Sequence, residues 1–208
     1  MGSSRSHWED VYAAKAETAV SWYQRHPVRS LQMIAAAAPD RTVPIIDVGG
    51  GASTLVDDLL AEGFGDITVL DVAEAALAKS KARLGAAGSG DGSKVSWIAA
   101  DITQWKPPRL YRVWHDRAVF HFLTDTARQD AYIAALEAAT APGATAIMAT
   151  FALDGPEKCS GLPVQRYSPQ TLAARLGLSF RLIDEARETH RTPGGSEQHF
   201  SYAVLRRL

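Results

Sequence analysis

The stretch Ile45-Ile46-Asp47-Val48-Gly49-Gly50-Gly51-Ala52-Ser53 decides the fold of this chain. A largely apolar strand ends in small residues there, and a helix is expected to begin at Ser53 or Thr54. Glycine has no Cβ to hold a ligand away from the backbone, and the first N–H groups of a helix have no partners within it. The stretch therefore predicts a strand-turn-helix unit that binds a nucleotide.

The spacing of the glycines distinguishes between nucleotides. The dinucleotide pattern Gly-x-Gly-x-x-Gly would place its third glycine at Thr54, which is β-branched, and this counts against NAD and FAD. The chain instead has an acid, Asp47, two residues before Gly49, and only Ala52 and Ser53 after the last glycine. The alternative is a plain tight connection between a strand and a helix.

Acids also close three further apolar runs. Residues 67–72 read as a strand that reaches Asp71, residues 95–100 precede Asp101, and residues 111–117 contain Asp116. Because ligands of open α/β sheets bind at the carboxyl ends of the strands, we expect these acids at one edge, beside the glycine turn. An acid placed like Asp71 can accept hydrogen bonds from the hydroxyls of a ribose.

This arrangement resembles the class I S-adenosylmethionine (SAM)-dependent methyltransferases, whose first motif reads apolar-apolar-acid-x-Gly-x-Gly-x-small. Ser53 stands where a last glycine is usual. The resemblance implies SAM as the cofactor and S-adenosylhomocysteine as its product. In that family the acid at Asp101 binds the adenine amino group, and Ile102 packs against the ring. The implied cofactor residues are Tyr12, Asp47, Gly49, Gly50, Gly51, Ala52, Ser53, Asp71, Val72, Asp101, Ile102 and Asp116.

The order of the expected elements predicts an α/β, Rossmann-like, doubly wound sheet. Helices are expected at 53–62, 73–84, 124–140 and 168–176, and strands at 144–151, 179–190 and 198–205. The last two strands form a hairpin across the turn at 192–196, which makes the final strand antiparallel. The resemblance implies seven strands in the order 3-2-1-4-5-7-6. One domain should cover residues 1–208, with a helical cap at 1–40, a SAM-binding core at 41–208 and a surface loop at 85–92.

Composition limits the partners. Lys and Arg number 22 against 23 Asp and Glu, a formal net charge of −1, so no basic field exists to hold nucleic acid. Cys159 is the one cysteine, which excludes an intramolecular disulfide and a cysteine-rich zinc site, and no histidine pair has zinc-site spacing. No apolar run is long enough to cross a bilayer, so we expect a cytoplasmic protein without a membrane partner. We also expect a monomer or weak homodimer that holds no metal.

The resemblance also implies a catalytic region after the fourth strand. His115, Asp116 and His121 are predicted near the transferring methyl group, with His121 as a general base because an imidazole titrates near neutral pH. The loop after residue 151 and the final hairpin are predicted to bind the acceptor through Lys158, Cys159, Tyr167 and His190.

The opening residues bear on the acceptor. Trp8, Tyr12 and Trp22 resemble the N-terminal helices of the methyltransferase-like subgroup that modifies protein lysines, and aromatic faces stabilise a sulfonium cation. We predict methyl transfer to a small-molecule nucleophile such as an amine, thiol or oxyanion. A protein lysine methyltransferase is the alternative, and a SAM-binding module without catalysis is a third possibility.

Overall fold

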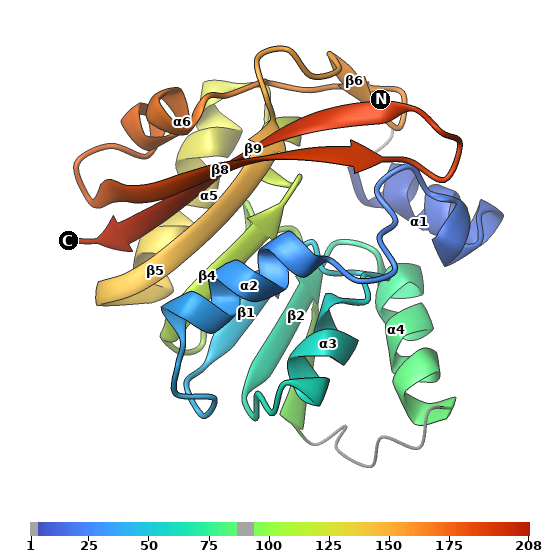
Figure 1. The fold of residues 1–208 in the computed structure, drawn as a ribbon, viewed down its shortest axis with the longest axis horizontal. Helices are drawn as coiled ribbons and strands as arrows, with labels where there is room; N and C mark the ends of the chain where they lie inside the picture. The colour runs from blue at the N-terminus through green and yellow to red at the C-terminus, as the bar shows by residue number, and fades with distance from the viewer. Residues whose placement is uncertain (1–3, 87–93) are drawn as a thin grey trace.

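Seven strands form one sheet in the order β3-β2-β1-β4-β5-β9-β8 in the computed structural model, which describes residues 4–86 and 94–208 (Figure 1). Strands β1 to β5 pair in parallel, and β9 is antiparallel to both β5 and β8. The predicted order and the antiparallel last strand are confirmed. The strands are β1 Ile45–Val48, β2 Ile67–Asp71, β3 Val95–Ala99, β4 Tyr111–Arg117, β5 Thr140–Phe151, β8 Phe180–Arg191 and β9 Glu197–Arg207.

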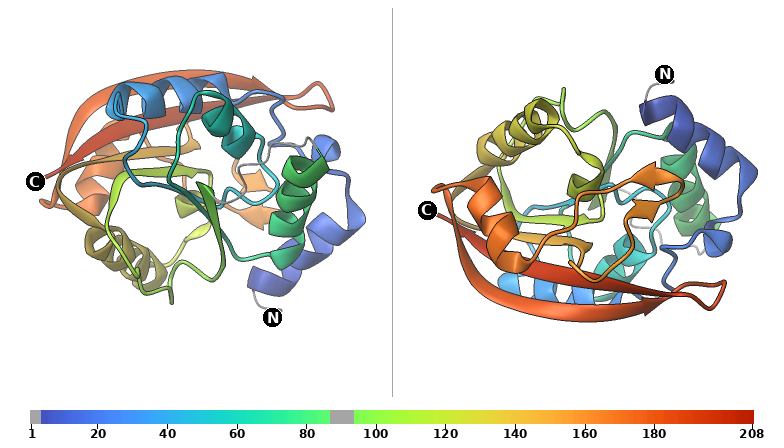
Figure 2. Two further views of the ribbon diagram at one scale, coloured as in Figure 1. Left: turned by 90° about the horizontal axis from the view of Figure 1, so that it is seen from below. Right: turned by 90° about the horizontal axis from the view of Figure 1, so that it is seen from above.

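Helices cover both faces of the sheet (Figure 2). Buried side chains of α2 (Val28–Ala37), α3 (Leu55–Ala61) and α4 (Glu74–Ala86) share one apolar cluster with Ile45 and Ile67. Helices α5 (Thr126–Ala138) and α6 (Pro169–Leu176) share the other cluster with Ile46 and Val48. Alternate residues of a strand face opposite ways, so both sides of the completely buried β1 pack against helices.

Local sequence explains where the helices begin and end. Asp125 caps α5 by accepting a hydrogen bond from the N–H of Arg128 at 2.9 Å. Ser168 and Thr171 form a capping box at α6, and Gly177, with φ of +80°, ends that helix. The helix predicted at 124–140 stops at Ala138 because β5 begins at Thr140, four residues earlier than expected.

The residues predicted to form one helical cap, 1–40, lie at two separate places in the fold. Helix α1 (Ser4–Ala14) lies beside α4, where the Glu9 carboxylate accepts hydrogen bonds from the first N–H groups of that helix, at Glu74 and Ala75. A short helix, η1 (Glu17–Ala19), follows, whereas α2 packs against β4 and β5 and belongs to the core.

Two short strands, β6 (Lys158–Cys159) and β7 (Leu162–Pro163), form an antiparallel pair between β5 and α6. In the loop predicted at 85–92, residues 87–92 lie outside the described residues. No helix of the described residues is long and apolar enough to cross a membrane.

Candidate functional site

A cavity of about 310 Å³ lies at the carboxyl edge of the sheet, beside the glycine turn. The ends of β1 to β4 line it, together with α1 and the β6–β7 pair. The acidic end of this cavity is defined by four residues, Asp71, Val72, Asp101 and Ile102, and the hairpin end by another four, Arg117, Cys159, Gln198 and Phe200. This is the edge at which open α/β sheets bind ligands.

The glycine turn packs too closely against its neighbours to carry side chains. Gly49 has φ of +73°, and a Cβ there would lie 2.0 Å from Val119 Cγ2. A Cβ on Gly51 would lie 2.5 Å from Asp71 Oδ2. Larger residues would displace Val119 and Asp71, and both of these line the cavity.

Not every residue of the predicted cofactor motif reaches this cavity. Gly49 lines it, whereas Asp47, Gly50, Ala52 and Ser53 line an adjoining cavity of about 60 Å³. Trp22, Val48, Gly49 and Arg117 border both cavities, so the two lie side by side.

Two carboxyl groups mark the acidic end. Asp71 Oδ1 accepts a hydrogen bond from the N–H of Ala73 at 2.8 Å, and burial raises the pKa of this carboxyl group to about 7. Asp101 Oδ1 accepts from the N–H and hydroxyl of Thr103 at 2.9 and 2.8 Å, and Asp101 Oδ2 lies 3.9 Å from Arg128 Nη2. The predicted residues Val72 and Ile102 lie beside these acids in the lining.

Aromatic side chains from the N-terminal segment cover the middle of the cavity. The Trp8 ring meets the rings of Trp22 and Phe122 edge-on, at centroid distances of 5.6 and 5.1 Å. Tyr12 is buried beside them, and burial together with the nearby Asp71 raises the pKa of its hydroxyl, which stays protonated. Tyr12 lines the same cavity as Asp71 of the acidic end and Cys159 of the hairpin end.

His115 and Asp116 make buried contacts away from the main cavity. His115 Nδ1 lies 2.7 Å from Asp47 Oδ1, and its Nε2 lies 2.9 Å from Ser30 Oγ, so both ring nitrogens are used. Asp116 points to the opposite face, where it accepts hydrogen bonds from two N–H groups of the next turn and from the hydroxyl of Tyr132. Burial raises the pKa of Asp116 to about 6. These contacts support roles in holding β4 to α2 and α5, rather than the predicted cofactor and catalytic roles.

His121 is fully buried and is not part of the cavity lining. Its ring packs against Phe122 and Phe151 at centroid distances of 4.5 and 4.9 Å, and its Nδ1 accepts a hydrogen bond from the N–H of Phe151 at 3.4 Å. Burial, reinforced by Arg117, lowers the pKa of His121 to about 3. This position does not support the predicted role of general base.

Of the four predicted acceptor residues, Cys159 lines the cavity. Burial raises the pKa of its thiol to about 11, so it faces the cavity as a neutral group. The other three lie elsewhere. Lys158 is exposed, Tyr167 is buried and accepts a hydrogen bond from Gln129 Nε2 at 3.0 Å, and His190 Nε2 lies 2.7 Å from the carbonyl oxygen of Ser21.

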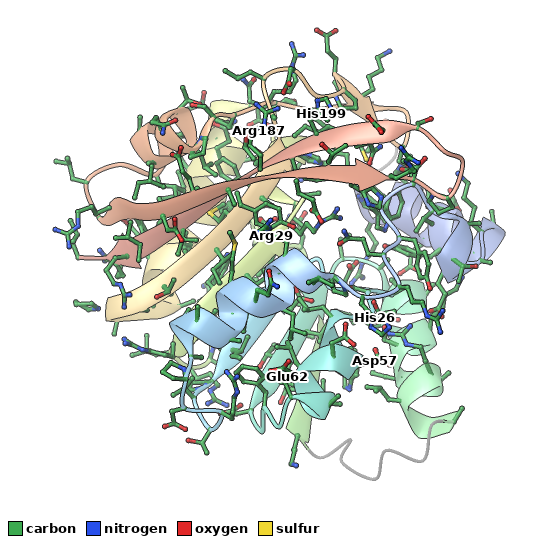
Figure 3. All side chains as sticks on the ribbon, in the orientation of Figure 1. His26, Arg29, Asp57, Glu62, Arg187 and His199 are labelled. Atoms are coloured by element: carbon green, nitrogen blue, oxygen red, sulfur yellow. The ribbon has the colours of Figure 1, made fainter. Side chains whose placement is uncertain are left out.

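The loop that leads to Cys159 is attached to the final hairpin. Figure 3 shows Arg187 and His199 on the hairpin strands, and both side chains bind the carboxylate of Asp154, at 2.7 and 3.2 Å. This contact holds the loop after β5 near the strands that carry Gln198 and Phe200.

The sequence did not single out Arg117, Gln198 and Phe200, the other three residues of the hairpin end. The Arg117 guanidinium lies 4.2 Å from the centroid of the Phe200 ring, and its Nε donates to the hydroxyl of Tyr202 at 3.2 Å. A signal for Arg117 was available. Strand alternation places residues 115 and 117 on the face opposite Asp116, so the final residue of β4 could have been preferred over the acid.

Within residues 4–86 and 94–208, no group of three or more His, Cys, Asp or Glu side chains is placed to hold a metal ion.

The chain resembles one protein family in sequence and a set of solved structures in fold. A family model described as a methyltransferase domain matches residues 46–146. None of the curated protein sequences compared with the chain matches it.

Solved structures share the fold at low identity. The N-methyltransferase NodS from Bradyrhizobium japonicum WM9, in complex with S-adenosyl-L-homocysteine, is 16% identical with a TM-score of 0.72, over 98% of each chain. The 1,6-didemethyltoxoflavin-N1-methyltransferase of Burkholderia thailandensis is 18% identical with a TM-score of 0.69, over 99% of this chain and 84% of that one. The glycopeptide N-methyltransferase MtfA is 12% identical with a TM-score of 0.70, over 89% and 92%.

Proposed function

We propose that this chain, of which residues 46–146 match a methyltransferase domain and which shares the fold of a solved N-methyltransferase, transfers a methyl group from SAM to a small-molecule nucleophile inside the cavity of about 310 Å³. SAM, when bound, supplies a methyl group on a positively charged sulfur, which a nucleophile displaces in line. The chain's own residues then have to hold the two reactants in line and exclude water.

The residues of the acidic end fit the cofactor. Gly49 lets the turn and Val119 lie together beside the cavity, where a Cβ would push Val119 away, and the Asp71 carboxyl group is proposed to bind the ribose hydroxyls. The Asp101 carboxylate faces the cavity for the adenine amino group, with Val72 and Ile102 as apolar neighbours of the ring. Tyr12 also lines the cavity, and its ring would face the sulfonium.

The elements that cover the cavity, together with its volume, support the choice of a small acceptor. Helix α1 and the β6–β7 pair both contribute to the lining, and the volume lies at the lower end of the range for small-molecule sites. The acceptor would lie at the hairpin end, with Cys159 as one of its contacts. Three solved structures of the same fold are named as N-methyltransferases, and one of them holds 1,6-didemethyltoxoflavin, a small molecule, together with S-adenosylhomocysteine.

A protein lysine acceptor is supported less well. Among the described residues that line the cavity, the acids are Asp71 and Asp101, both at the acidic end. At the hairpin end the Arg117 guanidinium is balanced by Glu188, 3.5 Å away, and no carboxylate of the described residues lines that end of the cavity to attract a lysine ammonium.

Calorimetry with SAM tests the proposal. The parent chain should bind SAM, and Asp71→Asn should weaken this binding by about tenfold or more, because a charge-assisted hydrogen bond is lost. Asp184→Asn, at an exposed position of β8, is the matched control and should leave the affinity unchanged. A parent chain that does not bind SAM rejects the proposed function. Incubation of tritiated SAM with cell extract, separated into metabolite and protein fractions, then tests the acceptor class, and label confined to the protein fraction would favour the lysine alternative.

A further inference from the structure

Three successive carbonyl groups of the glycine turn are bound by one helix, α4. The carbonyl oxygen of Gly51 accepts a hydrogen bond from the Ser80 hydroxyl at 2.8 Å. The carbonyl oxygens of Ala52 and Ser53 accept from the two terminal nitrogens of the Arg83 guanidinium, at 3.4 and 2.7 Å. Because Ser80 and Arg83 lie on the same face of α4, that face holds three consecutive peptide groups of the turn.

These contacts set the direction of the peptide groups. A trans peptide unit is planar, and its C=O and N–H groups point in opposite directions. Carbonyl groups that point to α4 therefore direct the N–H groups of Ala52, Ser53 and Thr54 away from that helix. Ala52 and Ser53 line the adjoining cavity of about 60 Å³, and Gly49 borders both cavities. The orientation of the turn thus decides which side of its backbone faces a ligand.

Two carboxylates hold the guanidinium of Arg83 in place. Asp57 of α3, labelled in Figure 3, accepts hydrogen bonds from Nε and Nη2 of Arg83 at 3.0 and 2.7 Å. Glu17 of η1 accepts from Nη1 at 2.7 Å. The Arg83 side chain is 21% exposed, so these charge-assisted hydrogen bonds are partly shielded from solvent. Because a guanidinium presents its donors in a rigid planar fork, fixing Arg83 also fixes the two carbonyl groups that share the fork.

Close packing joins the turn to both α4 and the acidic end of the cavity. A Cβ on Gly51 would lie 3.1 Å from the Cβ of Ala76, in α4, and 2.5 Å from Asp71 Oδ2. Ser80, which binds the carbonyl group of Gly51, is fully buried. A small shift of the turn relative to α4 would therefore reach the Asp71 carboxyl group, which lines the cavity.

We propose that Ser80 and Arg83 are positioning residues of the cofactor site, which hold the glycine turn in the orientation that receives the amino-acid end of SAM. The inference rests on the proposed function, in which Asp71 and Asp101 bind the ribose and the adenine. The amino-acid end, which is joined to the ribose through the sulfur, then lies beyond Asp71, beside the turn. Ser80 and Arg83 line neither of the two cavities, so both act through the turn.

Calorimetry with S-adenosylhomocysteine and with 5′-methylthioadenosine tests the inference. The second ligand keeps the adenine, the ribose and the sulfur but lacks the amino-acid end. Arg83→Met has an unbranched side chain without donors, and it should weaken S-adenosylhomocysteine by about tenfold or more and 5′-methylthioadenosine by less than about twofold. Ser80→Ala should weaken S-adenosylhomocysteine alone, by about threefold or more. An equal loss for both ligands overturns the inference, because Arg83 would then have no particular effect on the amino-acid end.

Arg41→Met is the matched control. Arg41 also donates to two backbone carbonyl groups, at 3.3 and 2.7 Å, and to the Glu62 carboxylate at 3.4 Å, but it lines neither cavity. Arg41→Met should lower the free energy of unfolding in urea, as Arg83→Met does, and leave both ligand affinities unchanged. If it weakens S-adenosylhomocysteine as much as Arg83→Met does, the loss reflects general destabilisation and the inference is wrong. Ser80→Ala removes one hydroxyl and no charge, and it carries the test if Arg83→Met does not fold.

The parent chain separates this inference from the proposed function. If the parent binds neither SAM nor S-adenosylhomocysteine, the proposed function itself fails. If the parent binds S-adenosylhomocysteine and the folded Arg83→Met variant binds it equally well, the proposed function stands and the positioning role is wrong.

Discussion

Asp71 links the cofactor site to the stability of the fold. The residue is 6% exposed, and burial raises the pKa of its carboxyl group from 3.8 to about 7. The folded protein therefore keeps a proton that the unfolded chain loses as the pH rises above 4, and folding stability falls with rising pH until about pH 7. One pKa unit corresponds to about 1.4 kcal/mol, so ionising this group in the folded state costs about 4 kcal/mol at pH 8.

The substitution Asp71→Asn removes this cost and keeps a side-chain oxygen for the N–H of Ala73. Any pH-independent effect of the amide cancels when two pH values are compared. Relative to the parent, the free energy of unfolding of the variant should rise by about 3 kcal/mol between pH 5 and pH 8. Urea unfolding of both proteins at these pH values, followed by tryptophan fluorescence, measures the difference.

A difference between parent and variant that stays within about 1 kcal/mol from pH 5 to pH 8 would refute this reasoning, because the carboxyl group would then ionise normally in the folded protein. The exposed Asp184→Asn should show no such pH dependence. Ribose hydroxyls donate to the ionised carboxylate, so the parent should also bind SAM more tightly as the pH rises through 7, and Asp71→Asn should lose this dependence.

Three further substitutions have definite expected outcomes. Gly49→Ala should abolish SAM binding in calorimetry and lower the melting temperature, because φ is +73° and the new Cβ meets Val119. Tyr132→Phe should lower the free energy of unfolding by about 1–3 kcal/mol in urea, since Asp116 loses a buried hydrogen bond. His121→Phe should leave the pH profile of turnover unchanged between pH 6 and 8. If the parent shows a rise in turnover near neutral pH that the variant lacks, His121 acts as a general base.

The fold was predictable because its signals are local. The strands that reach the ligand edge are short apolar runs with an acid at or near their ends. The turn of the final hairpin contains the sequence Pro-Gly-Gly at 193–195. Asp71 and Asp101 could be assigned to the cavity for the same reason, since Asp71 ends β2 and Asp101 lies two residues after the end of β3. Their place at the sheet edge follows from the strand that precedes them.

The acceptor residues could not be assigned in this way. Asp116 satisfies the same pattern, yet it lies one residue before the end of β4 and faces α5, where Tyr132 binds it. A shift of one residue along a strand reverses the face, and an apolar run does not show which face meets the ligand. Arg117, Cys159 and Phe200 come together only through the pairing of β9 with β5 and the loop between β5 and α6.

The two ends of the cavity thus depend on different parts of the chain. Strands β2 and β3 position Asp71 and Asp101 at the acidic end. At the hairpin end, Gln198 and Phe200 belong to β9, and Cys159 belongs to the β6–β7 pair. Side chains at the hairpin end can therefore change without moving the carboxylates at the acidic end. Because mutations at separated positions without shared partners act nearly independently, substitutions at Gln198 should alter the choice of acceptor while the affinity for the cofactor stays the same.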